Sequence, residues 1–111
     1  MSSESSASSF YPALDESALA DNSMEIVEVQ ERRVVLIKRL GKIHALDNTC
    51  PHLGGSLGRG TLQGNIVICP LHHWAFDLAS GQCVNGIPNE KIAVHETKIE
   101  DDKIWIRFSK I

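Results

Sequence analysis

The sequence has little of the features that mark several common protein classes. It holds only three cysteines in 111 residues, so disulfides are a poor explanation for Cys50, Cys69 and Cys83. No apolar run approaches the length of about 18 residues that a membrane-spanning helix needs. Basic residues form no run and the net charge is -3, which argues against nucleic acid as a partner. These absences predict a chain that folds in water and binds neither membranes nor nucleic acid.

Fingerprints of cofactor-dependent catalysis are missing as well. The sequence contains no glycine fingerprint for a dinucleotide, no phosphate-binding loop and no ligand triad for an oxygen-activating mononuclear iron. We therefore expect no catalysis by this chain alone.

The N-terminus lacks the pattern of a secretory signal. Its first residues, MSSESSASSF, carry Glu4 where a signal has basic residues before an apolar core. Such a serine-rich stretch has almost nothing to bury, so we expect a disordered tail over residues 1–10. Residues 11–111 are enough for one domain with one modest core. Without a signal, the expected location is the cytoplasm.

Short β-branched segments, separated by turn residues, run through the rest of the chain and predict an all-β fold. A helical turn is expected only around residues 15–20. The first predicted strands are residues 24–29, 33–40 and 42–47. Gly41 and Lys42 would form the tight turn between the last two.

The second half repeats this pattern. Two short strands would meet near Gly64, where glycine allows positive φ, and residues 92–100 would pair with residues 103–111. The expected architecture is an antiparallel β-sandwich or barrel with a loop-rich insertion at about residues 48–78.

The most informative residues lie in that insertion. One loop supplies Cys50 and His52 as Cys-x-His; after sixteen intervening residues, 53–68, Cys69 and His72 follow as Cys-x-x-His. Because the two loops flank a predicted hairpin, each would bring one cysteine and one histidine to a common point. Thiolates select soft metals, and imidazole accepts iron, zinc or copper. The four residues therefore form a candidate metal site.

These motifs resemble a known family. The sequence CPH at residues 50–52, followed at this spacing by CPLH at residues 69–72, is similar to the ligand pattern of the Rieske iron-sulfur proteins. The resemblance extends through GGSLGRG, WAFDLASG and NGIPNEKIAVHE, and covers most of the chain from about Val34 onward. It implies a Rieske-type β fold with a cluster-binding insertion.

The resemblance also implies a cofactor and its ligands. Cys50 and Cys69 would bind one iron of a single [2Fe-2S] cluster per chain. His52 and His72 would bind the other iron. Two neutral imidazoles in place of two thiolates leave less negative charge on the cluster, which makes the cluster easier to reduce.

The function that the resemblance implies is that of a one-electron carrier, monomeric in isolation. It would pass electrons from a reductase to a terminal oxygenase or another redox enzyme. Small ferredoxins of oxygenase systems and the small subunit of assimilatory nitrite reductase are both similar, and we favour the stand-alone carrier. A sensor that reports oxidants by losing its cluster is a further alternative.

A zinc-stabilised interaction module is the main alternative for the ligands themselves, because two cysteines and two histidines also suit tetrahedral zinc. Zinc modules, however, usually pair cysteine with cysteine and histidine with histidine at short spacing. The interleaved order here favours an iron-sulfur cluster.

Four positions predict a low reduction potential. High-potential members of the family carry an extra cysteine in each loop, where this sequence has Gly55 and Leu71. They also carry a serine and a tyrosine that donate hydrogen bonds to sulfur, where this sequence has Trp74 and Phe76. Fewer donors stabilise the reduced cluster less, so we expect a midpoint below zero, roughly -150 mV.

Other conspicuous residues have simpler interpretations. We expect Cys83 to be a small buried residue, and His44 and His95 to be structural residues of strands. We do not expect His73 to bind metal, and any functional role of it would be at the docking surface. Pro88 resembles the proline of a third loop over the cluster, or marks an ordinary turn.

Overall fold

The computed structural model describes residues 9–50, 55–71, 73–85 and 91–109. Its strands are β1 Tyr11–Asp15, β2 Ser23–Val29, β3 Arg32–Arg39, β4 Lys42–Asp47, β5 Thr61–Gln63, β6 Ile66–Ile68, β7 Ala75–Asp77, β8 Val94–Glu100 and β9 Lys103–Arg107. Helix in this part of the chain is limited to two 3₁₀ turns, η1 Glu16–Ala18 and η2 Leu57–Arg59, and none of it could span a membrane. The predicted all-β fold is confirmed, and the helical turn expected at residues 15–20 is η1.

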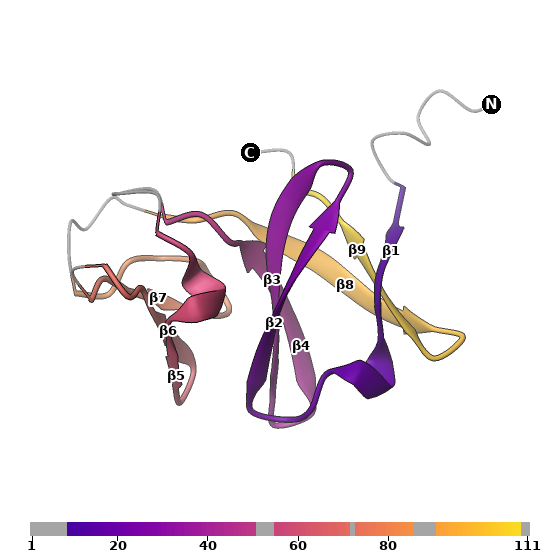
Figure 1. The fold of residues 1–111 in the computed structure, drawn as a ribbon, viewed down its shortest axis with the longest axis horizontal. Helices are drawn as coiled ribbons and strands as arrows, with labels where there is room; N and C mark the ends of the chain where they lie inside the picture. The colour runs from indigo at the N-terminus through magenta and orange to yellow at the C-terminus, as the bar shows by residue number, and fades with distance from the viewer. Residues whose placement is uncertain (1–8, 51–54, 72, 86–90, 110–111) are drawn as a thin grey trace.

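The strands form two antiparallel sheets. The larger sheet has the order β1-β9-β8-β4-β3-β2, and β1 also contacts β2, so the sheet nearly closes into a barrel. The smaller sheet, β5-β6-β7, lies beside the β2–β4 part of the barrel, on the side away from β8, β9 and β1 (Figure 1). The barrel expected from the sequence is confirmed.

Two-residue turns connect β2 to β3, β3 to β4 and β8 to β9. Both residues of each turn have positive φ, as in Leu40 (52°) and Gly41 (79°), which is the geometry that matches the twist of a hairpin. The sequence prediction placed this turn at Gly41 and Lys42; Lys42 is instead the first residue of β4. The turn expected between residues 92–100 and 103–111 is confirmed, and its residues are Asp101 and Asp102.

Strand β1 is the element that the sequence did not predict. It pairs with β9 near the other end of the chain, with Tyr11 opposite Ile106, and its register shifts between Pro12 and Leu14. Proline has no N–H to donate and is tolerated at an edge or a bulge of a sheet. Pro12 therefore argued locally against a strand whose hydrogen-bonded neighbour, β9, lies about 90 residues further along the chain.

Strand β3 is buried on both faces and separates two apolar cores. Val34 and Leu36 point into the barrel, where they pack with Ile104 and Ile106. The alternate residues pack outside the barrel against the small sheet. That outer core contains Val35, Ile37, Leu46, Cys50, Leu57, Val67, Cys69, Phe76, Leu78, Cys83 and Ile92. Because successive side chains of a strand alternate between its faces, one continuous VVLI run serves both cores.

Candidate metal centre

The two predicted cysteine ligands lie together in the outer core. Cys50 follows β4 and is 2% exposed, whereas Cys69 follows β6 and is fully buried. Both are free thiols of one apolar cluster. Burial raises the pKa of the Cys69 thiol, and the neighbouring Cys50 thiol raises it further, while a backbone hydrogen bond at Leu71 acts in the opposite direction. Two thiolates in such a place need a cation, which is what a metal centre supplies.

Each cysteine lies at the start of a loop that closes on itself. The Cys50 N–H donates to the carbonyl of Gly55 at 2.8 Å, and the Cys69 N–H donates to the carbonyl of Trp74 at 2.7 Å. We call residues 48–58 the first ligand loop and residues 69–75 the second ligand loop. Their closure fixes the backbone next to each sulfur and directs both thiols to the same point.

The two ligand loops are in direct contact, and a glycine makes that contact possible. A Cβ atom added at Gly55 would lie 2.9 Å from Cys69 Sγ and 3.1 Å from a methyl carbon of Leu71. Any larger residue would push the sulfur away or move the loop. The cysteine that high-potential Rieske proteins carry at this position could therefore not be accommodated without a shift of the second ligand loop. The donor chemistry and this close approach fit an iron-sulfur cluster.

The predicted histidine ligands, His52 and His72, lie outside the described residues, as does Pro88. Their placement therefore stays a prediction. Within the described residues, no three histidine, cysteine or acidic side chains come together as a metal site. The structure thus brings together Cys50 and Cys69, the thiolate half of the predicted donor set.

The predicted burial of Cys83 is confirmed, because Cys83 lies in the outer core. Phe76 is fully buried in the same core, and Trp74 packs against it partly exposed. His73, which was not predicted to bind metal, is exposed and has a positive φ of 59°.

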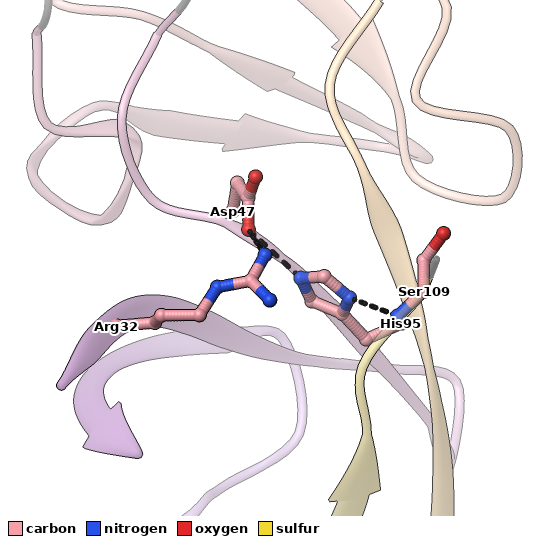
Figure 2. A network of polar contacts seen from close by, with 4 residues as sticks. All are labelled: Arg32, Asp47, His95 and Ser109. Atoms are coloured by element: carbon pink, nitrogen blue, oxygen red, sulfur yellow. Dashed lines mark hydrogen bonds and ion pairs between the residues drawn. The ribbon is translucent and has the colours of Figure 1, made fainter. Parts of the chain in front are cut away.

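A polar network that the sequence did not predict supports the strand leading into the first ligand loop (Figure 2). The side chain of His95 is fully buried, and its Nε2 lies 2.8 Å from Asp47 Oδ1. The Ser109 N–H donates to His95 Nδ1 at 3.0 Å, so Nε2 carries the proton that is donated to Asp47. Arg32 binds the same carboxylate oxygen at 3.4 Å. Strands β3, β4 and β8 and the C-terminal segment thus meet at Asp47, which lies three residues before Cys50.

This network changes the ionisation of Asp47. The hydrogen bond from His95 lowers the pKa of Asp47, and the positive charge of Arg32 lowers it further, against the opposing effect of burial. His95 is therefore a structural strand residue, as predicted. Its partner lies 48 residues away in sequence, so no local spacing could have identified the pair.

Comparison with known proteins agrees with this geometry. The Rieske [2Fe-2S] domain family matches residues 9–96. The ferredoxin component of the alkene monooxygenase system of Xanthobacter autotrophicus is 40% identical over 89 residues, covering 79% of this chain and 72% of that protein. Human apoptosis-inducing factor 3 is 34% identical over 92 residues, which are 83% of this chain and 15% of the human protein.

The fold is likewise that of solved ferredoxins. The ferredoxin of carbazole 1,9a-dioxygenase from Nocardioides aromaticivorans IC177 superposes with a TM-score of 0.84 at 17% identity, covering 92% of this chain and all of that one. The sequence match spans β1 to β7 with both ligand loops, and it ends near the start of β8. This chain therefore belongs to the Rieske [2Fe-2S] domain family, and its cofactor is the two-iron, two-sulfur cluster of that family.

Proposed function

We propose that this chain is a one-electron carrier that takes electrons from a reductase and passes them to a terminal oxygenase. The observation that carries the proposal is the convergence of Cys50 and Cys69, buried and unpaired, at the contact between two closed loops. The 40% identical relative, a ferredoxin component of a monooxygenase system, supports an oxygenase as the acceptor and not a nitrite reductase.

Four residues would hold the cluster. Cys50 and Cys69 would bind one iron, and His52 and His72 would bind the other, as the motif spacing indicates. When bound, the cluster accepts and releases a single electron. The chain's own contribution is to keep the sulfur ligands in an apolar core, where water is excluded and the surrounding dipoles are fixed.

The partner would approach the end of the molecule that carries the second ligand loop. Leu71 is 44% exposed although it is apolar, and it directly precedes the ligand position His72. Val84 is 51% exposed, and its N–H donates to Ala75 at the other end of the loop. Apolar side chains at the centre of a transient interface supply much of its affinity.

The test begins with the cofactor of the purified protein. We expect iron and acid-labile sulfide in about equal amounts, and after reduction an EPR spectrum with the low average g value of mixed histidine and cysteine ligation. A potentiometric titration should follow a one-electron curve with a midpoint of roughly -150 mV. Zinc without sulfide would refute the proposal, and a midpoint well above zero would contradict the argument from missing hydroxyl donors.

Single substitutions then assign the ligands. His52→Ala and His72→Ala should each abolish the Rieske spectrum, because each removes one of the two proposed imidazole ligands. Cys83→Ala is the matched control, since Cys83 is a buried thiol of the same core that is not a proposed ligand. Retention of the wild-type spectrum in either histidine variant would overturn the assignment.

Repeated redox cycles separate a carrier from a sensor. A carrier should return its full EPR signal after many cycles of reduction by dithionite and oxidation by ferricyanide. Loss of iron in the first oxidations would favour a sensor.

A further inference from the structure

We propose that Asn48 and Asn85 are positioning residues of the cluster, each fixing one ligand loop through its side-chain amide. The inference rests on the proposed function, because it concerns the residues that orient the proposed ligands. Neither asparagine would bind iron itself.

Asn48 fixes the first ligand loop. It is 2% exposed, and its Oδ1 accepts a hydrogen bond from the Gly58 N–H at 2.8 Å. Its Nδ2 donates to the hydroxyl of Ser56 at 2.9 Å. Its main-chain carbonyl accepts from the Leu57 N–H at 2.8 Å. Asn48 therefore joins the start of the loop to its end, across the segment that contains Cys50.

Asn85 fixes the second ligand loop in the same manner. Its Oδ1 accepts from the Ala75 N–H at 2.8 Å, and its Nδ2 donates to the carbonyl of His73 at 2.9 Å. These two residues flank Trp74, whose carbonyl receives the hydrogen bond from the Cys69 N–H. His73 has a positive φ of 59°, a conformation that is unfavourable for a residue with a side chain and needs support from its surroundings.

The amide group suits both positions because it donates and accepts at once. In the second ligand loop the two groups to be satisfied are one N–H and one carbonyl, so neither a pure donor nor a pure acceptor would serve. In the first ligand loop the two groups that bind the amide are one N–H and one hydroxyl, and a hydroxyl can either donate or accept a hydrogen bond. The two positions should therefore respond differently to aspartate.

The loops also depend on each other. They touch where Gly55 meets Cys69 Sγ, so movement of either loop changes the space around the sulfur atoms. Residues that orient metal ligands typically change metal affinity about 10- to 100-fold when they are removed.

The experiment measures cluster release from the reduced holoprotein to an iron chelator, together with the EPR spectrum. In Asn48→Ala and Asn85→Ala we expect release at least about 10-fold faster than in the wild type and an EPR signal altered in g values or width. The matched control is Asn65→Ala, an exposed asparagine in the turn between β5 and β6, which should behave as the wild type.

Aspartate variants separate positioning from general destabilisation. In Asn48→Asp the Ser56 hydroxyl can donate to the new carboxylate, so release should return to within a few-fold of the wild type. In Asn85→Asp the carbonyl of His73 cannot donate, so release should stay fast. A role limited to fold stability would lower the melting temperature but leave the EPR spectrum of the loaded molecules unchanged, and that result would overturn the proposal.

The remaining outcomes are equally decisive. If Asn48→Ala does not fold, Ser56→Ala tests the same loop by removing only the hydroxyl partner, and it should speed release several-fold. Release equal to that of Asn65→Ala in both alanine variants would refute the positioning role and leave the proposed function intact. A wild-type protein without a Rieske spectrum would refute the proposed function, and the positioning role with it.

Discussion

The carboxylate of Asp47 accepts hydrogen bonds from two neighbouring strands, through His95 on β8 and Arg32 on β3. Because these groups lower its pKa below the ordinary value of 3.8, the folded protein binds fewer protons here than the unfolded chain does. Stability from this group is therefore fully present above pH of about 4 and is lost as the pH falls through the folded-state pKa.

Asp47→Asn should consequently lower the melting temperature at neutral pH and lose that difference in acid. The physical reason is that the protonated wild-type carboxyl and the amide are both uncharged. Thermal unfolding from pH 2 to pH 7 measures the effect, with Glu25→Gln, an exposed acid-to-amide change on β2, as the control. A constant difference between Asp47→Asn and the wild type across this range would contradict the pKa shift.

At the residue scale, the sequence predicted the proposed ligands better than it predicted the residues that hold them in place. Cys50 and Cys69 were identifiable because their spacing to histidine reflects the geometry of a cluster. Asn48, Asn85 and Asp47 were not identified, because their role is defined by partners that only the fold brings near. His95 was predicted to be structural, but its partner was not. Asparagine next to a loop is common, and a strand histidine gives no sign of the carboxylate 48 residues away.

At the scale of elements, two glycines are required for different reasons, one for its backbone conformation and the other for lack of space for a side chain. Gly41 has a φ of 79° and open space around its missing Cβ, whereas a Cβ at Gly60 would overlap the carbonyl oxygen of Ile68. The first glycine is needed for the conformation of a turn. The second allows the chain after η2 to lie against the end of β6.

Gly41→Ala should therefore destabilise the protein by about 1 kcal/mol, the cost of a left-handed conformation. Gly60→Ala should cost about 3 kcal/mol, because the backbone must shift to relieve the overlap. Denaturant unfolding of both variants checks the order. The visible spectrum adds a second criterion: only Gly60→Ala should perturb the cluster, and equal effects of the two substitutions would argue against this packing.

The hairpins were predictable because each has its turn signal within a few residues. The exact position of a turn was harder to predict. The sequence placed one turn at Gly41 and Lys42, whereas its residues are Leu40 and Gly41. Glycine can occupy either central position of such a turn, so its presence alone does not set the register. Strand β1 could not be predicted, since its partner β9 lies at the other end of the chain and Pro12 argues locally against a strand.

At the scale of the whole molecule, the two cores have different requirements. The fully buried residues of the barrel core are aliphatic, whereas the outer core contains both cysteine ligands. Metal bonds would therefore connect the first and second ligand loops without crossing the barrel. The two cores should differ in their dependence on the cofactor.

Removing the cluster should loosen the small sheet and leave the barrel folded. Amide hydrogen exchange of the cofactor-free protein should show protection retained in β3 and β9 and lost in β5 and β6, because the loops that flank the small sheet are no longer joined. Uniform loss of protection across all strands would show instead that the molecule unfolds as one unit.

The exposed apolar residues give a prediction for partner binding. Leu71→Ser should slow reduction by any flavoprotein reductase that reduces the wild type, by about 10-fold, while the midpoint potential stays unchanged. Leu40→Ser is the control, since Leu40 is 75% exposed at the β3–β4 turn, at the opposite end of β4 from the first ligand loop. Equal rates for the two variants would place the docking surface elsewhere.

The double burial of β3 has a consequence for protein engineering. The even-numbered residues Val34 and Leu36 pack in the barrel core, and the odd-numbered residues Val35 and Ile37 pack in the outer core with the two cysteines. A library of variants at the even positions would change thermal stability without changing electron transfer. A library at the odd positions would change the surroundings of the cysteine ligands. The parity of the residue number along this strand thus decides which property a designer changes.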